Sequence, residues 1–180
     1  MESAIPDTDR LTFKKITPEI YDALFKNSSN EEIKAFFGFE TDAALEAEKA
    51  KYAVGIRTFN KTFLYFQLLD KNTQSIIGWC GYHTWYLDHA RAEIGYGLFG
   101  EEHKNKGLMT EAMRPILDYG FDQMKLNRVE AFVGLNNVPS LRLLKRFNFT
   151  QEGHVREHYN NTGTPEDSLI FSLLLSERDQ

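Results

Sequence analysis

Apolar and polar positions along the chain follow two different periods, which predicts a protein built from both strands and helices. Residues 11–16 alternate apolar and polar side chains for most of their length, as a half-buried strand does. Thr17 followed by Pro18 is typical of a helix start, and apolar residues recur at helical spacing behind it. Residues 30–53 are rich in alanine and charge, which favours helix, with a break near Gly38.

The period changes to two in the middle of the chain. The aromatic-rich stretch 62–69 and the stretch 76–83 are expected strands joined by a turn, so they predict a hairpin with a longer loop. A third strand is expected at 92–98, with Gly95 and Gly97 inside it. Glycine within a strand indicates a bulge or the close approach of another group to the backbone.

The second half of the chain alternates between helical and extended patterns. A long apolar stripe predicts a helix at 108–124, and Pro115 inside it should cause a kink. A strand, a helix and two strands are expected after it, at 129–133, 139–147, 149–152 and 169–175. Strands joined by helices after an antiparallel meander predict a mixed α/β or α+β sheet.

Composition limits what such a protein can be. With 180 residues, 42% of them hydrophobic, the chain suits one well-packed domain, which we expect to span 1–180. We find no run of the roughly 18 apolar residues that a membrane helix needs, and the first residues lack the pattern of a secretory signal. Cys80 stands alone, which suits a reducing compartment. We therefore expect a cytoplasmic protein without a membrane partner.

Charge and histidine spacing argue against nucleic-acid binding and against a metal site. The net charge is −5, whereas nucleic-acid-binding domains are usually basic, so a binder that uses Lys104, Lys106 and Arg114 is disfavoured. An acidic protein favours cationic partners such as amines. His154 and His158 are four residues apart but lie in an extended pattern, so they would not share a helical face, and we expect no metal site.

Residues 104–111 combine a donor-rich loop with a helix start. The first N–H groups of a helix are unpaired, the helix dipole adds positive potential, and Gly107 lets a ligand approach the backbone closely. Lys104 and Lys106 add positive charge. Taken alone, the segment is either an anion-binding site or a solvated basic loop before an ordinary helix.

The wider pattern resembles a known family. Residues 92–112, 126–131, 137–149 and 152–157 stand in the order and spacing of the GNAT superfamily of N-acetyltransferases, and within it of the RimJ/RimL-like branch. The resemblance covers nearly the whole chain. It implies a central mixed, mostly antiparallel twisted sheet of six to seven strands, flanked by about four helices and splayed between the fourth and fifth strands.

The resemblance also implies acetyl-CoA as co-substrate. In the family's pyrophosphate loop, Arg/Gln-x-x-Gly-x-Gly/Ala, Gly107 matches, whereas Lys104 replaces Arg or Gln and Met109 replaces a small residue that must then point to the core. The pantetheine arm is expected along the backbone near 96–98. The cofactor-binding residues that it implies are Tyr96, Gly97, Leu98, Lys104, Asn105, Lys106, Gly107, Leu108, Met109, Thr110, Asn137 and Ser140.

Asn137 and Ser140 match the family's Asn-x-x-Ser, whose side chains meet the cofactor near its sulfur. Asn137 would equally well cap the helix that follows it. Ser140 is a candidate acid for the departing thiolate, although a thiol with a pKa of about 8.5 leaves without much help. A backbone N–H of the expected strand 92–98 could stabilise the oxyanion that forms when an amine attacks a thioester.

The attacking amine must be neutral, so a base is needed. Glu93 lies among apolar neighbours, which should raise its pKa and suit it to accept a proton, unless it is an ordinary strand carboxylate paired with Arg91. Glu157 is a second candidate base, with a solvated loop residue as the alternative, and His83 a less favoured third. Tyr159 is a candidate proton donor.

Together these residues predict direct transfer of an acetyl group to an amine in a ternary complex. Resemblance to the RimJ/RimL branch implies a protein or peptide α-amino group as acceptor, of the ribosomal-protein type. A small amine (a polyamine, an amino acid or an aminoglycoside) and a non-catalytic acyl-CoA-binding module are left open, as is a homodimer.

Overall fold

The computed structural model describes residues 5–55, 62–160 and 163–178, in which seven strands form one sheet. The strands lie in the order β1-β2-β3-β4-β5-β7-β6, and every neighbouring pair is antiparallel except β4 and β5. Their bounds are β1 Leu11–Ile16, β2 Thr62–Asp70, β3 Ile76–Tyr86, β4 Arg91–Leu98, β5 Arg128–Gly134, β6 Thr150–Tyr159 and β7 Glu166–Leu174. The expected fold class is confirmed.

Five α-helices accompany the sheet in the described residues, one more than expected. They are α1 Pro18–Asn27, α2 Asn30–Phe37, α3 Asp42–Val54, α4 Leu108–Asp122 and α5 Val138–Arg146. The expected break at Gly38 separates α2 from α3, because Gly38 adopts the left-handed conformation (φ 72°) that ends a helix. Thr17 caps α1 through its side chain, as the sequence predicts.

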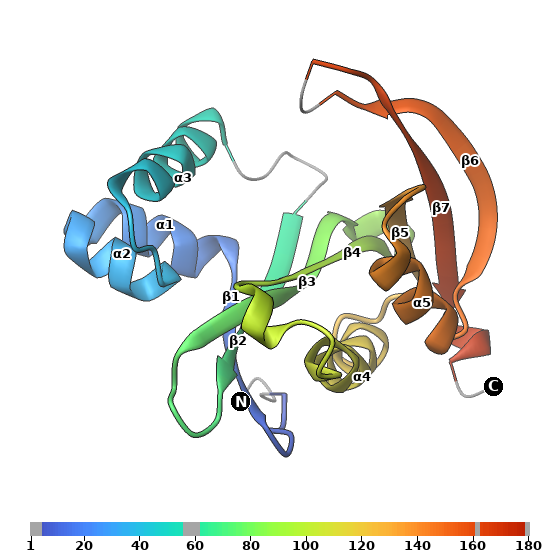
Figure 1. Ribbon diagram of the computed structural model, residues 1–180, viewed down its shortest axis with the longest axis horizontal. Helices are drawn as coiled ribbons and strands as arrows, with labels where there is room; N and C mark the ends of the chain where they lie inside the picture. Colours follow the sequence, from blue (N-terminus) through green and yellow to red (C-terminus); the bar gives the residue numbers. More distant parts are fainter. Residues whose placement is uncertain (1–4, 56–61, 161–162, 179–180) are drawn as a thin grey trace.

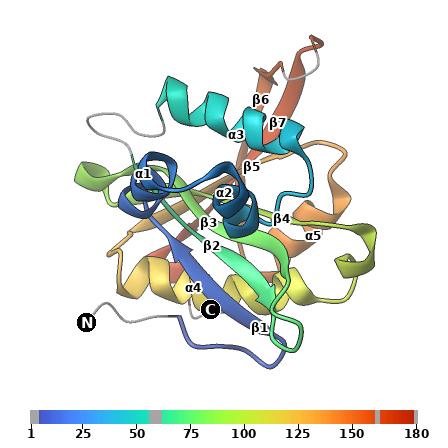
Figure 2. The ribbon, with the colours of Figure 1, turned by 90° about the vertical axis from the view of Figure 1, so that its left-hand side faces the viewer.

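The helices divide between the two faces of the sheet (Figures 1 and 2). Figure 1 shows α1, α2 and α3 grouped on one side and α4 on the other. Alternation along β4 produces this division, because Ala92 and Ile94 are buried in the core that α4 covers, and Glu93 between them faces the opposite way. The hydroxyl of Tyr82 donates to the carbonyl of Ile116 at 2.8 Å and joins the sheet to α4.

The parallel pair β4 and β5 is joined over a short stretch only. Arg91, Ala92 and Glu93 are opposite Arg128, Val129 and Glu130, and beyond these three pairs the two strands separate. β4 continues to Leu98 on β3, whereas β5 continues to Gly134 on β7. We call this opening the fork; it is the splay expected between the fourth and fifth strands, and Glu93 is the last paired residue of β4 at its closed end.

The bounds of the last two strands differ from those expected from the sequence. The expected strand 149–152 is much too short, since β6 runs from Thr150 to Tyr159; its outward polar residues give no apolar run to recognise. The last strand begins and ends earlier than the expected 169–175, at Glu166 and Leu174.

In the part of the chain that the structure describes, no helix combines the length and the apolar character that a membrane span needs.

Candidate active site

The start of α4 forms the proposed anion-binding segment. Gly107 is its N-cap residue, in the left-handed conformation (φ 77°), and no side chain caps the first turn. Arg10, before β1, braces this turn: its guanidinium donates to the Lys106 carbonyl at 2.9 Å and to the Glu111 carboxylate at 2.6 Å. Burial raises the pKa of Glu111, but hydrogen bonds from Thr8 and Arg10 outweigh it and lower the pKa below its usual value. Sequence reasoning gave Arg10 no role.

The expected loop residues lie close together around this turn. Lys104 is ion-paired with Glu101, and Asn105 has positive φ (58°), as a tight loop requires. Leu108 is buried, and Met109 packs against the main core, which is the inward direction expected of it. The anion-binding role of these residues stays a prediction.

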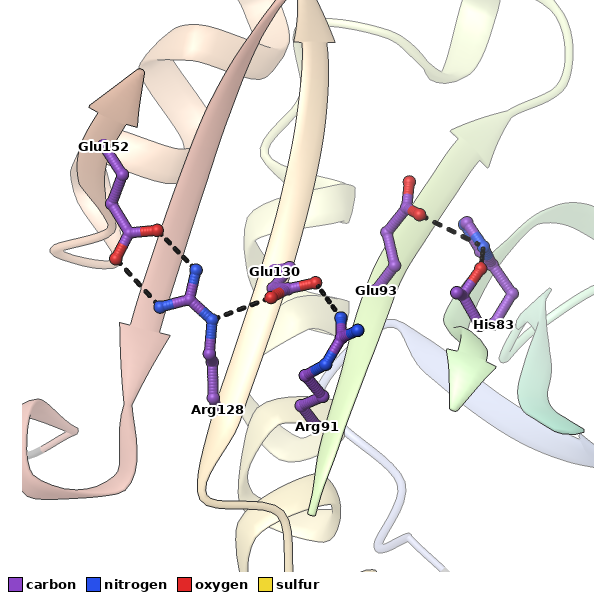
Figure 3. A network of polar contacts seen from close by, with 7 residues as sticks. His83, Arg91, Glu93, Arg128, Glu130 and Glu152 are labelled. Carbon is purple, nitrogen blue, oxygen red and sulfur yellow. Dashed lines mark hydrogen bonds and ion pairs between the residues drawn. The ribbon is translucent and has the colours of Figure 1, made fainter. Parts of the chain in front are cut away.

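Glu93 lies at the closed end of the fork with only 15% of its side chain exposed (Figure 3). Burial, helped by the charge of Glu130, raises the pKa of Glu93 to about 7. The ionisable base that contacts Glu93 among the described residues is His83, and its Nδ1 lies 3.7 Å from the Glu93 carboxylate. Burial lowers the pKa of His83, so that imidazole is neutral at pH 7 and provides no counter-charge. The expected raised pKa of Glu93 is confirmed.

Arg91 does not pair with Glu93, the alternative that the sequence left open. Its guanidinium donates to Glu130 at 2.8 Å, and Nε of Arg128 donates to the other oxygen of Glu130, also at 2.8 Å. Arg128 continues to Glu152 through two further hydrogen bonds, so an ionic chain crosses β4, β5 and β6 (Figure 3). Glu130 was part of the recognised pattern, but its partners could not be predicted because they depend on strand register.

The two glycines of β4 leave room for an aromatic ring. A Cβ at Gly95 would lie 2.8 Å from the Trp79 ring, and one at Gly97 would lie 3.3 Å from its Nε1. The β3–β4 register is regular here, so a bulge is wrong and close approach of another group is confirmed. That group is the indole of Trp79, on the face that carries Glu93.

Tyr96 faces the other side of β4, toward α5. Asn137 accepts a hydrogen bond from the backbone N–H of Ser140 at 3.3 Å and so caps α5. The Tyr96 hydroxyl is buried and has no hydrogen-bond partner among the described residues. Burial raises the pKa of Tyr96 to about 12. A buried hydroxyl without a partner is costly, and this one lies beside the fork.

Tyr159 and Glu157 have different surroundings. The pKa of Tyr159 is raised by burial and then by the charge of Glu93, so these two groups are coupled electrostatically. Glu157 is exposed, has positive φ (52°), and donates its backbone N–H to Asp167 at 2.8 Å. The centre of the His158 ring lies 4.5 Å from that of Phe132 on β5, with the two rings tilted by 50°.

The remaining candidates have ordinary surroundings. Cys80 is fully buried, and burial raises the pKa of its thiol, as expected of a packed core residue. His154 lies in β6 and contacts Asp167 at 2.7 Å. Within the described ranges, no group of three or more His, Cys, Asp or Glu is arranged to hold a metal ion.

The fold and the fork agree with comparisons to known proteins. The family model for the acetyltransferase (GNAT) domain matches residues 10–150. The Bacillus subtilis (strain 168) protein named uncharacterized N-acetyltransferase YoaA is 32% identical over 94% of this chain and 96% of its own. The Bacillus licheniformis protein named uncharacterized N-acetyltransferase p20 is 34% identical over 94% of this chain and 96% of its own.

A solved structure extends the agreement at the level of the fold. The spermidine N-acetyltransferase from Vibrio cholerae, in complex with CoA and spermine, superposes with a TM-score of 0.68 over 96% of this chain and 100% of that one, at 20% identity. The match of the family model, together with relatives above 30% identity along nearly the whole length, decides the family. This chain belongs to the GNAT family and is an acetyl-CoA-dependent N-acetyltransferase.

Proposed function

We propose that this enzyme acetylates the α-amino group of a protein or peptide, by direct attack of the amine in a ternary complex. The observation that carries the proposal is Glu93: a half-buried carboxylate at the closed end of the fork, with a pKa of about 7 and no arginine or lysine paired with it in the described chain. Such a group accepts a proton near neutral pH, which converts the incoming ammonium into the neutral amine that attacks the thioester.

The acceptor class follows from matching pKa values. An α-amino group titrates at about 7.7–8.0 and a lysine-like alkylamine at about 10.4. Proton transfer to a base with a pKa of about 7 is therefore uphill by roughly one pKa unit from the α-amino group. From the alkylamine it is uphill by more than about three pKa units. Glu93 favours the α-amino group, in line with the resemblance to the RimJ/RimL branch. A polyamine is the alternative, supported by the shared fold of the spermidine enzyme.

The residues present suit acetyl-CoA as the donor, which supplies the acetyl group as a thioester. The buried, unpartnered hydroxyl of Tyr96 offers a hydrogen bond beside the fork. The first turn of α4, with Gly107 at its N-cap, offers backbone N–H groups for the pyrophosphate, while Lys104 and Lys106 add charge. We assign Tyr96, Gly97 and Leu98 to the pantetheine arm, and 104–110 with Asn137 and Ser140 to the rest of the cofactor.

Base and acid would lie on opposite faces of the sheet. Glu93 faces the side of α1, α2 and α3 and would take a proton from the incoming amine. Ser140, in α5, would donate a proton to the departing thiolate. Tyr159, coupled electrostatically to Glu93, would orient the acceptor, and the exposed Glu157 would meet it further out. The homodimer and the cytoplasmic location remain predictions, the first to be measured by sedimentation.

The acceptor class is tested with one peptide in two blocked forms and a polyamine. The first form has a free α-amine and dimethylated lysines; the second has an acetylated N-terminus and free lysines; spermidine is the third acceptor. We expect mass gain and CoA thiol release with the first form alone. Turnover of spermidine alone would overturn the peptide assignment. If acetyl-CoA binds but no CoA thiol is released with any of the three acceptors, the catalytic assignment of Glu93 would be overturned.

A further inference from the structure

We propose that Glu130 is a positioning residue that holds Arg91 away from Glu93 and so keeps Glu93 without a cationic partner at the fork. This inference rests on the proposed role of Glu93 as the base. It concerns a group that would not touch either substrate and would act through its neighbour.

Arg91 has two carboxylates within its reach. Arg91 and Glu93 are two residues apart on β4, so their side chains share one face of the sheet. Glu130 is the register partner of Glu93 across the parallel pair, and its side chain is on that face as well. Arg91 bonds to Glu130 at 2.8 Å, and its guanidinium lies 4.1 Å from the centre of the Tyr86 ring. One contact from β5 and one from β3 therefore hold Arg91 in a position where it does not pair with Glu93.

Arg91 pairs with Glu130 rather than with Glu93, and other contacts fix the Glu130 side chain in place. Its side chain is 12% exposed and accepts from Arg128 as well as from Arg91. Arg128 is fixed in turn by Glu152, which also accepts from the Ser172 hydroxyl at 2.7 Å. The chain Glu152, Arg128, Glu130, Arg91 contains two negative and two positive charges and is balanced in itself. Both arginines of this ionic chain, Arg91 and Arg128, are therefore engaged with carboxylates other than Glu93.

The other groups that face Glu93 cannot take the place of a cation. His83 on β3 is neutral at pH 7, because burial lowers its pKa. Tyr159 on β6 has a raised pKa and is neutral too. Glu130 on β5 carries a negative charge. Removing the charge of Glu130 would therefore do two things: end its repulsion of Glu93 and release Arg91 to pair with Glu93.

Both effects would lower the pKa of Glu93, and direct titration can measure them without turnover. The carboxyl ¹³C resonance of Glu93, identified by its loss in Glu93→Gln, is followed against pH in the free enzyme. We expect Glu130→Gln to move the midpoint down by about one unit or more, a tenfold change in acidity. The acidic limb of the kcat/KM profile should move with it.

A double variant separates the two effects. Arg91→Ala combined with Glu130→Gln removes the released arginine, so the midpoint should rise again toward neutrality, and Glu130→Asp, which keeps the charge, should stay near the wild type. A midpoint that is unchanged in Glu130→Gln, or equal in the single and double variants, would overturn the inference.

If Glu130→Gln fails to fold, the Glu93 titration midpoint is measured in Arg91→Gln instead. Because Arg91 is bound to Glu130, its loss should change the Glu93 midpoint by less than about half a unit; a rise of about two units would mean that Arg91 is the partner of Glu93. If the carboxyl midpoint shifts as expected and the kcat/KM limb does not, the assignment of Glu93 as base fails while the role of Glu130 stands.

Discussion

Glu93 and Glu130 are neighbours on one face of the sheet, yet only Glu130 has arginine partners in the described chain. The sequence predicts the direction of the Glu93 pKa shift correctly, but the flanking residues Ala92 and Ile94 face the α4 side, so the burial that raises this pKa comes from the other face of the sheet. The sequence cannot predict that Arg91 turns to Glu130, since that choice depends on which residues of β5 are opposite β4. Nor can it predict the electrostatic coupling of Glu93 to Tyr159, which comes from a strand more than sixty residues further along.

Glu93→Gln should slow transfer by roughly 10²- to 10⁴-fold, the range for loss of a general base, and should remove the acidic limb near pH 7. The measurement is kcat/KM against pH with the α-amine peptide. Acetyl-CoA affinity should be unchanged, since Glu93 faces the acceptor side. A variant that keeps the wild-type limb would show that another group accepts the proton.

The same substitution should stabilise the protein above pH 7. The folded-state pKa of Glu93 lies above its unfolded value, so its contribution to stability is fully present below about pH 4.5 and is lost as the pH rises through about 7. At pH 8 Glu93→Gln should gain of the order of 1 kcal/mol after allowance for solvent screening. Thermal melts at pH 8 and at pH 5 give the comparison, and a larger gain at pH 5 would contradict it.

At the scale of elements, strand and helix positions were largely predictable from the sequence, and their ends were less so. Gly38 and Gly107 mark a helix end and a helix start because both need positive φ, a requirement that is local and therefore visible in the sequence. The full length of β6 was not predictable, because this strand pairs with β7 alone and carries many exposed polar side chains. Local chemistry predicts caps; pairing partners decide how far a strand runs.

Arg10→Ala should loosen the turn at the start of α4. Arg10 binds both the Lys106 carbonyl and the Glu111 carboxylate, so its loss removes the contacts that fix the turn whose backbone N–H groups are proposed to meet the pyrophosphate. We expect KM for acetyl-CoA to rise about tenfold with little change in kcat, and stability to fall by about 1 kcal/mol or less, since Arg10 is half exposed.

Lys49→Ala is the matched control for Arg10→Ala, because Lys49 forms an exposed ion pair on α3, away from α4. Its KM for acetyl-CoA should equal that of the wild type. A fall in kcat without a change in KM for Arg10→Ala would contradict the proposed role of the turn.

On the scale of the whole molecule, the sheet consists of two parts, β1–β4 and β5–β7, joined by three residue pairs and the ionic chain. Backbone groups of β4 that point toward β5 beyond Glu93 have no partner in the ladder. Acetyl-CoA bound in the fork should bridge the two parts, so amide exchange should slow in the peptides that cover 94–98 and 131–134. Mass spectrometry measures this, with β1 and β2 as the reference; protection confined to α1–α3 would contradict it.

Trp79 gives this arrangement a practical consequence. Its indole lies across Gly95 and Gly97, next to the face on which Glu93 and His83 meet. The emission of an indole depends on the polarity around it, so the protein carries an intrinsic fluorophore beside its proposed acceptor site. Trp85 packs against the main core and contributes a steadier background. Acceptor entry can therefore be followed optically in the unlabelled enzyme.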